Sequence, residues 1–262
     1  MHIALDTMKP ERLPTFKELI LQEKAQAVYA RLGKAYGIRQ WKPRRPPLRE
    51  LISTLLSHRT TSENEVAAMD RLWQNYGSWE AIRDAPVEGI EKAIHGVNWA
   101  DRKAPYLKRV LQVISQERGD DFHLDVLNNL STEEAMNWLT SLPGVGVKTA
   151  SLVLLFNFRK PVMPVDTHVH RVSQRLGLIG SKVTPEKAHE LLPPLLPRDA
   201  DVYWNFHLNM IRHGREVCVW ERPRCEHCVV KDLCDYYNTV VRDEQSMGSY
   251  KKFSATDVSA SA

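Results

Sequence analysis

Residues 142–150 read LPGVGVKTA, and this stretch decides the fold. Its two glycines, Gly144 and Gly146, predict a tight turn between two apolar segments of helical periodicity, 132–141 and 148–158. Glycine permits unusual backbone angles and lets a partner approach the main chain closely. The turn opens onto a helix N-terminus, which favours an anion such as a nucleic-acid phosphate. The same sequence is also compatible with a plain helical hairpin that binds no ligand, so the turn alone leaves the function open.

Helical periodicity continues on both sides of this turn, and strand signals are few, so we predict an all-α protein. Gly37 is a predicted helix stop, and the Ser-x-x-Glu patterns beginning at Ser62 and Ser131 are predicted capping boxes. From about Thr239 large apolar residues become rare, so 239–262 is predicted to be a disordered tail. The predicted helices are 16–36, 47–58, 62–76, 79–84, 87–95, 101–118, 132–141, 148–158, 166–176, 185–193 and 200–213.

The composition is that of an ordinary globular protein. The chain has 262 residues, 43% of them hydrophobic and 26% charged, which excludes collagen-like, coiled-coil and wholly disordered proteins. The net charge of +4 permits a polyanionic partner without requiring one. We see neither a signal peptide nor an apolar run long enough for a membrane span, so we expect a cytoplasmic or nuclear protein, not a secreted one, with no membrane partner.

A basic stretch without acidic residues covers 31–49 and is interrupted by prolines. Such a charge run is most simply a solvated connection between helices. A strip of phosphate contacts is the alternative. The sequence does not decide between the two. Its cations are Arg31, Lys34, Arg39, Lys42, Arg44, Arg45 and Arg49.

The four cysteines lie close together in the sequence, with spacings of six, two and five residues. Four thiolates in so short a loop can enclose one tetrahedral zinc ion or a cubane iron–sulfur cluster. Composition alone slightly favours zinc. Because four thiolates complete either site, we expect the neighbouring His227 to be a bystander. The predicted metal ligands are Cys218, Cys225, Cys228 and Cys234.

Lys148 and Asp166 are the candidate catalytic pair. Lys148 follows the glycine turn, and Asp166 lies within MPVDTHVHRV at 163–172. Taken singly, Lys148 is an ordinary surface lysine and Asp166 an N-cap. Taken together, a partly desolvated amine can attack a sugar carbon, and a carboxylate across a cleft can accept its proton and stabilise a cationic sugar.

At these residues the chain resembles a known family. LPGVGVKTA followed by PVDTHVHRV is similar to the helix-hairpin-helix and Gly-Pro-Asp motif (HhH-GPD) of DNA glycosylases, and above all to the endonuclease III family of base-excision repair. The resemblance covers roughly 45–236. It implies a two-lobed fold, with a six-helix lobe at 40–160 and a cluster lobe made of 1–39 and 161–238.

The resemblance also implies an activity. Lys148 takes the place of a lysine that attacks C1′ of a damaged nucleoside, and Asp166 that of the catalytic aspartate. The expected protein is a monomeric glycosylase and abasic-site (AP) lyase acting on oxidised pyrimidines or abasic sites in duplex DNA, in a bacterial nucleoid or a nucleus. Two alternatives stay open. One is a monofunctional glycosylase that uses water activated by Asp166, and the other is a DNA-binding protein with reduced catalysis.

Further site residues follow from the resemblance. It reverses the preference for zinc and implies a structural [4Fe–4S] cluster on the four cysteines. Arg59 replaces the usual glutamine of a loop that fills the space left by a flipped base, Trp99 matches the apolar wedge, and Val147 replaces a commonly basic residue. The expected DNA contacts are therefore Pro143, Gly144, Val145, Gly146, Arg59, Trp99, Arg222 and Arg224.

Overall fold

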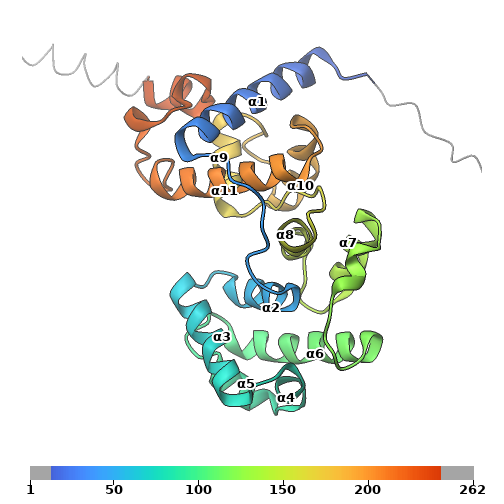
Figure 1. The fold of residues 1–262 in the computed structure, drawn as a ribbon. Coiled ribbons are helices and arrows are strands. Elements are labelled where there is room, and N and C mark those ends of the chain that lie inside the picture. Colours follow the sequence, from blue (N-terminus) through green and yellow to red (C-terminus); the bar gives the residue numbers. More distant parts are fainter. Residues whose placement is uncertain (1–12, 243–262) are drawn as a thin grey trace, which may run out of the picture.

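The computed structural model describes residues 13–242, and every regular element in that range is helical (Figure 1). The predicted all-α fold is therefore confirmed. The α-helices are α1 (Phe16–Tyr36), α2 (Pro47–Ser57), α3 (Ser62–Tyr76), α4 (Trp79–Asp84), α5 (Val87–Ala93), α6 (Ala100–Arg118), α7 (Thr132–Ser141), α8 (Val147–Phe158), α9 (Thr167–Leu176), α10 (Pro185–Leu191) and α11 (Ala200–Glu216). Short turns of other helical types are η1 (Asp125–Asn128), η2 (Pro193–Leu195), η3 (Cys225–His227), η4 (Lys231–Leu233) and η5 (Tyr237–Val241).

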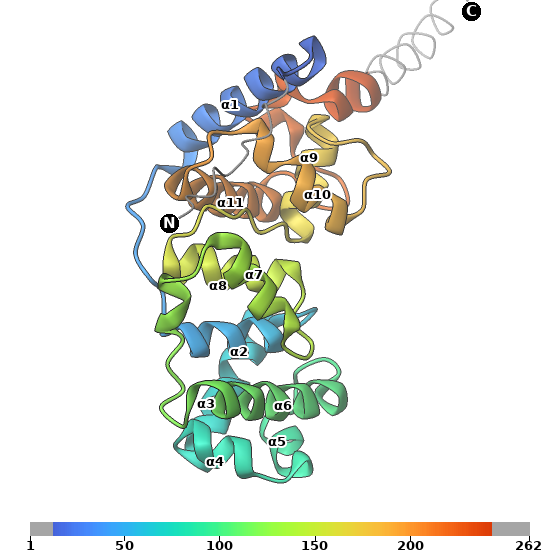
Figure 2. The ribbon, with the colours of Figure 1, turned by 90° about the vertical axis from the view of Figure 1, so that its right-hand side faces the viewer.

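Two apolar cores hold these helices together. One is built from α2 to α8 and includes Leu51 and Leu107. The other joins α1 to α8–α11 and includes Phe206. Helix α8 lies between the two groups (Figure 2) and contributes Leu154 to the first core and Leu155 to the second. A helix that buries residues in two cores is apolar on nearly every side. This explains the almost continuous run of apolar residues in α8 after the glycine turn. The lobe boundaries given above stay a prediction.

The connection between α1 and α2 runs along the second core and across the end of α8. Trp41 donates its indole N–H to the carbonyl of Leu155 at 2.8 Å. The backbone N–H of Arg39 donates to Asn205 Oδ1 at 2.8 Å, and the Asn157 amide donates to the carbonyl of Arg45 at 2.7 Å. These long-range bonds fix the connection to both groups of helices.

Most helix ends agree with the sequence to within two residues, but α11 continues to Glu216, beyond the predicted end at 213, and one N-cap differs. Ser131 and Glu134 form the predicted capping box, and Gly37 ends α1 with a φ of 90°. The box predicted at Ser62 is wrong, because Thr61 is the N-cap and accepts from the N–H of Asn64. Both residues have a hydroxyl, but only Thr61 has the extended backbone that a cap requires.

The C-terminal end of the described chain is ordered further than expected. Tyr237–Val241 form a π-helical turn, so the structure corrects the beginning of the predicted tail at 239. The remainder of that tail, 243–262, lies outside the described residues. Among the helices of 13–242, none has the length and apolar character needed to cross a membrane.

Candidate active site and cysteine cavity

The turn between α7 and α8 presents free backbone at a helix start. Gly144 has a φ of +76°, and a Cβ there would lie 3.1 Å from the Tyr106 ring. Leu142 and Val145 are buried and anchor the turn to the first core. Gly146 caps α8 without a side-chain hydrogen bond, and no atom lies within 4 Å of where its Cβ would be. The first N–H groups of α8 are therefore open to an anion.

Lys148 lies in the first turn of α8 and is half-buried. Burial lowers the pKa of its amine, and the charge of Asp166 opposes that shift without cancelling it. Asp166 is the N-cap of α9, where its Oδ1 accepts from the N–H groups of His168 at 2.9 Å and Val169 at 2.7 Å. Within residues 13–242, the other oxygen of Asp166 has no hydrogen-bond partner. The structure thus pairs an amine that deprotonates readily with a fixed carboxylate.

Both side chains line one open cleft of about 720 Å³. Its walls come from the loop after α2, the start of α8 and the segment around Asp166. Arg59 and Trp99 line the same cleft. The residues assigned to catalysis and to base displacement therefore surround a single space, although they come from four separate stretches of sequence.

Arg59 and Trp99 form a pair at the surface. Both have positive φ, 50° and 58°, which side chains other than glycine rarely adopt. The Arg59 guanidinium lies 5.6 Å from the centre of the Trp99 ring, and the Asn98 side chain donates to the carbonyl of Arg59. Trp99 is 46% exposed, so it is not a core residue. The two loops are tied together as one unit.

Lys103 of α6 is a residue of this region that the sequence did not indicate. Its ammonium is buried below the loop after α2, and burial lowers its pKa to about 8. It donates to Leu56 O at 2.7 Å, His58 O at 2.8 Å and Thr60 Oγ1 at 3.3 Å. A lysine early in an amphipathic helix gives no sign of such acceptors, because they lie more than forty residues away in the chain.

Two histidines near Lys148 were missed as well. His58 Nε2 lies 3.1 Å from Thr149 Oγ1, and burial lowers the pKa of His58 to about 4, with the charges of Lys148 and Lys103 adding to the shift. His189 of α10 lines the cleft and contacts the backbone before Asp166. Single histidines in helical segments have no spacing that marks them in a sequence.

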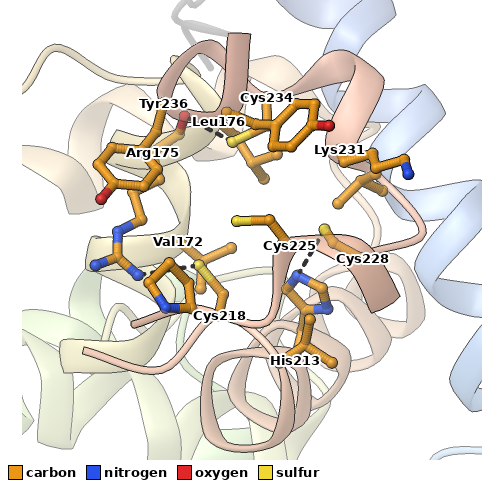
Figure 3. A pocket seen from close by; sticks show the side chains of 14 residues that line it. Val172, Arg175, Leu176, His213, Cys218, Cys225, Cys228, Lys231, Cys234 and Tyr236 are labelled. Atoms are coloured by element: carbon orange, nitrogen blue, oxygen red, sulfur yellow. Dashed lines mark hydrogen bonds between the residues drawn. The ribbon is translucent and has the colours of Figure 1, made fainter. Parts of the chain in front are cut away.

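The four cysteines line one small cavity (Figure 3). Their sulfurs point toward its centre, and the apolar side chains of Val172, Leu176 and Val230 complete the wall. Arg175 donates to Cys218 Sγ at 3.4 Å, and His213 Nε2 lies 3.5 Å from Cys228 Sγ. Across 13–242 no group of three metal-binding side chains converges tightly enough for a single ion. Four thiols around one cavity are a donor set that fits a cubane iron–sulfur cluster, and the same thiols can also bind one zinc ion.

The expected phosphate contacts divide into exposed and paired arginines. Arg222 and Arg224 are exposed on the loop between the first two cysteines, where Arg224 also donates to the carbonyl of Glu216. Many of the cations of the basic stretch 31–49 are paired with acidic residues of the protein. This favours a connection between helices over a strip of phosphate contacts. The ion pairs of this stretch are Arg31 with Asp232, Arg44 and Arg45 with Glu50, Arg45 with Glu65, and Arg49 with Asp70.

Comparison with known proteins identifies the family. The model of the HhH-GPD superfamily of base excision DNA repair proteins matches residues 52–198. Endonuclease III of Thermotoga maritima is 35% identical over 191 residues, 73% of this chain and 84% of the relative. The chain belongs to the endonuclease III family. Endonuclease III of Escherichia coli K12 is 30% identical over 194 residues, 74% of this chain and 86% of the relative.

Solved structures of endonuclease III agree with this assignment. A trapped covalent endonuclease III–DNA intermediate with an estranged adenine matches with a TM-score of 0.69 at 25% identity, over 83% of this chain and 97% of that one. A non-covalent endonuclease III–DNA complex matches in fold with a TM-score of 0.72 at 24% identity, over 84% of this chain and 98% of that one. The resemblance stated from the sequence is confirmed.

Proposed function

We propose that this protein removes oxidised pyrimidines from duplex DNA and cuts the strand at the abasic site, with Lys148 as nucleophile and Asp166 as its acid–base partner. As a member of the endonuclease III family, the protein is a base-excision-repair DNA glycosylase with AP lyase activity. One observation carries the assignment of roles. A half-buried amine of lowered pKa shares a cleft with a carboxylate whose second oxygen has no partner within 13–242. The substrate places the protein at the cell's DNA, in a nucleoid or a nucleus.

DNA binding begins at the glycine turn. The open N–H groups at the start of α8 bind a backbone phosphate, and the absence of a side chain at Gly146 lets that phosphate approach. A stacked base cannot reach Lys148, so the damaged nucleotide must turn out of the helix. Arg59 and Trp99 fill the space it leaves, because their exposed pair lies at the cleft where the nucleotide enters.

The chemical steps use the two cleft residues. The neutral amine of Lys148 forms a bond to C1′ as the glycosidic bond breaks, and the bonding electrons leave with the base. The attacking nitrogen gives its extra proton to Asp166, which also stabilises positive charge on the sugar. Opening of the sugar ring gives a Schiff base between Lys148 and C1′. Asp166 returns its proton to O4′ as the ring opens and then accepts a proton from C2′, and the electrons of that C–H bond expel the phosphate from C3′ and cut the strand.

The cysteine cavity has a structural role in this proposal. Cys218, Cys225, Cys228 and Cys234 would hold a [4Fe–4S] cluster, with zinc as the alternative to test. When bound, the cluster supplies a rigid centre for a loop that has only short helical turns of its own. That loop presents Arg222 and Arg224 to the DNA backbone. An iron assay together with the visible absorption of the purified protein separates the two metals.

A panel of lesion duplexes tests the function. The wild-type protein is incubated with duplexes that carry an oxidised pyrimidine, an abasic site or no damage, beside Lys148→Ala and Asp166→Asn. Cleavage of both damaged duplexes by the wild type alone supports the proposal. Base removal without strand cleavage indicates the monofunctional, water-using glycosylase. Binding without either reaction indicates a DNA-binding protein, and cleavage of undamaged DNA alone overturns the repair function.

A further inference from the structure

Two histidines from different helices hold the backbone that leads into Asp166. His189 of α10 accepts a hydrogen bond from the N–H of Val165 at 3.1 Å through Nε2, and its Nδ1 donates to the carbonyl of Pro185 at 2.8 Å. His207 of α11 is buried and donates from Nδ1 to the carbonyl of Pro164 at 2.9 Å. The peptide bond between Pro164 and Val165 is therefore held on both its carbonyl and its N–H side.

The partners of His189 fix its protonation state. A backbone N–H only donates, so Nε2 must offer a lone pair to Val165. A carbonyl only accepts, so Nδ1 must carry the proton. Only the neutral imidazole has one nitrogen of each kind, because the imidazolium has two donors. A charged His189 would direct an N–H at the N–H of Val165 and lose this contact.

We propose that His189 is a positioning residue for Asp166, because its contact with Val165 fixes the chain immediately before the carboxylate. The inference rests on the proposed role of Asp166. Beyond Asp166 the chain is fixed by the start of α9, whose N–H groups bind Oδ1. On the other side of Asp166, the hydrogen bond from the buried Val165 N–H to His189 fixes the chain, and we call this contact the clamp. The carboxylate then meets the Lys148 amine at a set position, and small displacements of such groups are costly in rate.

The surroundings of His189 keep it neutral at neutral pH. Burial is the largest influence and lowers its pKa, and the positive charge of Lys148 on α8 acts in the same direction. Glu186 on its own helix raises the pKa but does not offset the burial. Asp166 shares the cleft wall with it, and Arg198 lines the adjoining groove. Acid that charges His189 is therefore expected to release the clamp.

Two amide variants, each of which matches one ring nitrogen of His189, distinguish the hydrogen bond to Val165 from packing of the ring. In His189→Gln the amide oxygen reaches the place of Nε2 and accepts from Val165. In His189→Asn the shorter amide still donates to Pro185 but cannot reach Val165. We expect single-turnover cleavage of an abasic duplex to slow about 10-fold in His189→Asn and to stay within about 3-fold of wild type in His189→Gln. Affinity for a duplex with a chemically reduced, uncleavable abasic site should change less than about 2-fold in both.

The pH profile gives a readout that packing would not move. Protonation of Lys148 slows wild type and His189→Gln alike, so it cancels from the ratio of their rates. Only the wild type has an imidazole at position 189 that can become charged. The ratio of wild-type to His189→Gln rate should therefore fall as the pH is lowered below the ordinary imidazole pKa of about 6.5.

Three results would overturn the inference: an undiminished rate in His189→Asn, an equal loss in both variants, or a rate ratio that does not change with pH. Hydrogen exchange of the Val165 amide tests the clamp without catalysis, and it should be faster in His189→Asn than in wild type or His189→Gln. If the wild type neither cleaves DNA nor forms an adduct, the proposed function fails. The exchange measurement then still decides whether the clamp exists.

Discussion

Two lysines lie near the loop after α2, Lys103 buried and Lys148 half-buried, and their ammonium groups have different contacts. Lys103, at the start of α6, donates to three oxygens of that loop and of the end of α2. Lys148, at the start of α8, has no side-chain hydrogen bond within 13–242 and faces the cleft it shares with Asp166. Burial lowers the pKa of both amines.

A lowered lysine pKa therefore does not by itself identify a nucleophile. The three acceptors around Lys103 favour its charged form and occupy its protons, so its nitrogen has no free lone pair. The same ammonium satisfies the carbonyls at the end of α2. Lys148 has burial without such acceptors, and it can therefore attack carbon. Lys103 holds the loop that carries Arg59, whereas Lys148 is the nucleophile in the function that we propose.

The largest expected effect is the loss of the Lys148 amine. Lys148→Ala should lower strand cleavage at an abasic site by about 10³-fold or more, because no other lysine of residues 13–242 lines the cleft to form the Schiff base. Single-turnover cleavage measures the rate, and circular dichroism checks the fold. The matched variant Lys103→Met should stay within about 10-fold of wild type. Equal losses in the two variants would contradict the distinction between them.

The second effect concerns the partner of the amine. Asp166→Asn keeps a good N-cap for α9, so the protein should stay within about 1 kcal/mol of wild-type stability. Cleavage should fall about 10²-fold because the proton acceptor is lost.

The pH profile sharpens this second test. In the wild type, cleavage should rise with pH as Lys148 deprotonates and level off below the ordinary lysine pKa of about 10.4. Asp166 raises the pKa of Lys148, so its removal should move the half-maximal rate to lower pH. A midpoint that moves to higher pH would argue against this pairing of charges.

The third effect concerns the cysteine loop. In our proposal a bound cluster holds this loop in place, whereas the cleft is formed by helix ends. Cys228→Ser should lose most of the iron, weaken DNA binding about 10-fold and expose the loop around 217–236 to protease. The helices α2 to α6 belong to the other core and should stay protected. Iron assay, DNA affinity and limited proteolysis measure the three changes. Protection lost evenly along the chain would show that the loop and the cleft do not fold independently.

The smallest effect on activity should come from Lys103→Met, whose consequence is stability. Removing the ammonium leaves the carbonyls of Leu56 and His58 without their donor, at a cost of about 1–3 kcal/mol. Urea unfolding measures this free energy, and trapping with borohydride should still occur. A variant as stable as wild type would show that Lys103 does not hold the loop.

Local rules of helix formation predicted most of the fold. Capping residues and glycine stops placed most helix ends within a residue or two, since those signals lie in the same few residues that they control. The exception at Thr61 and Ser62 arose because both side chains can cap. Thr61 has the extended backbone of an N-cap, whereas Ser62 is already the first residue of α3.

The site was predictable only in part, for a physical reason. Lys148, Asp166 and the four cysteines lie in short motifs that can be recognised along the chain. The acceptors of Lys103, the histidine that contacts Val165 and the Asp232 partner of Arg31 come from segments brought close only by folding. Such contacts have no spacing in the sequence.

The most direct test of the central claim is to locate the covalent bond. The full-length protein is incubated with an abasic duplex, reduced with borohydride, digested with nuclease and protease, and mapped by mass spectrometry. We predict that the sugar remnant lies on Lys148 in the wild type and that Lys148→Ala gives no adduct. An adduct on Lys103 or on any other amine, or turnover without an adduct, would contradict the account.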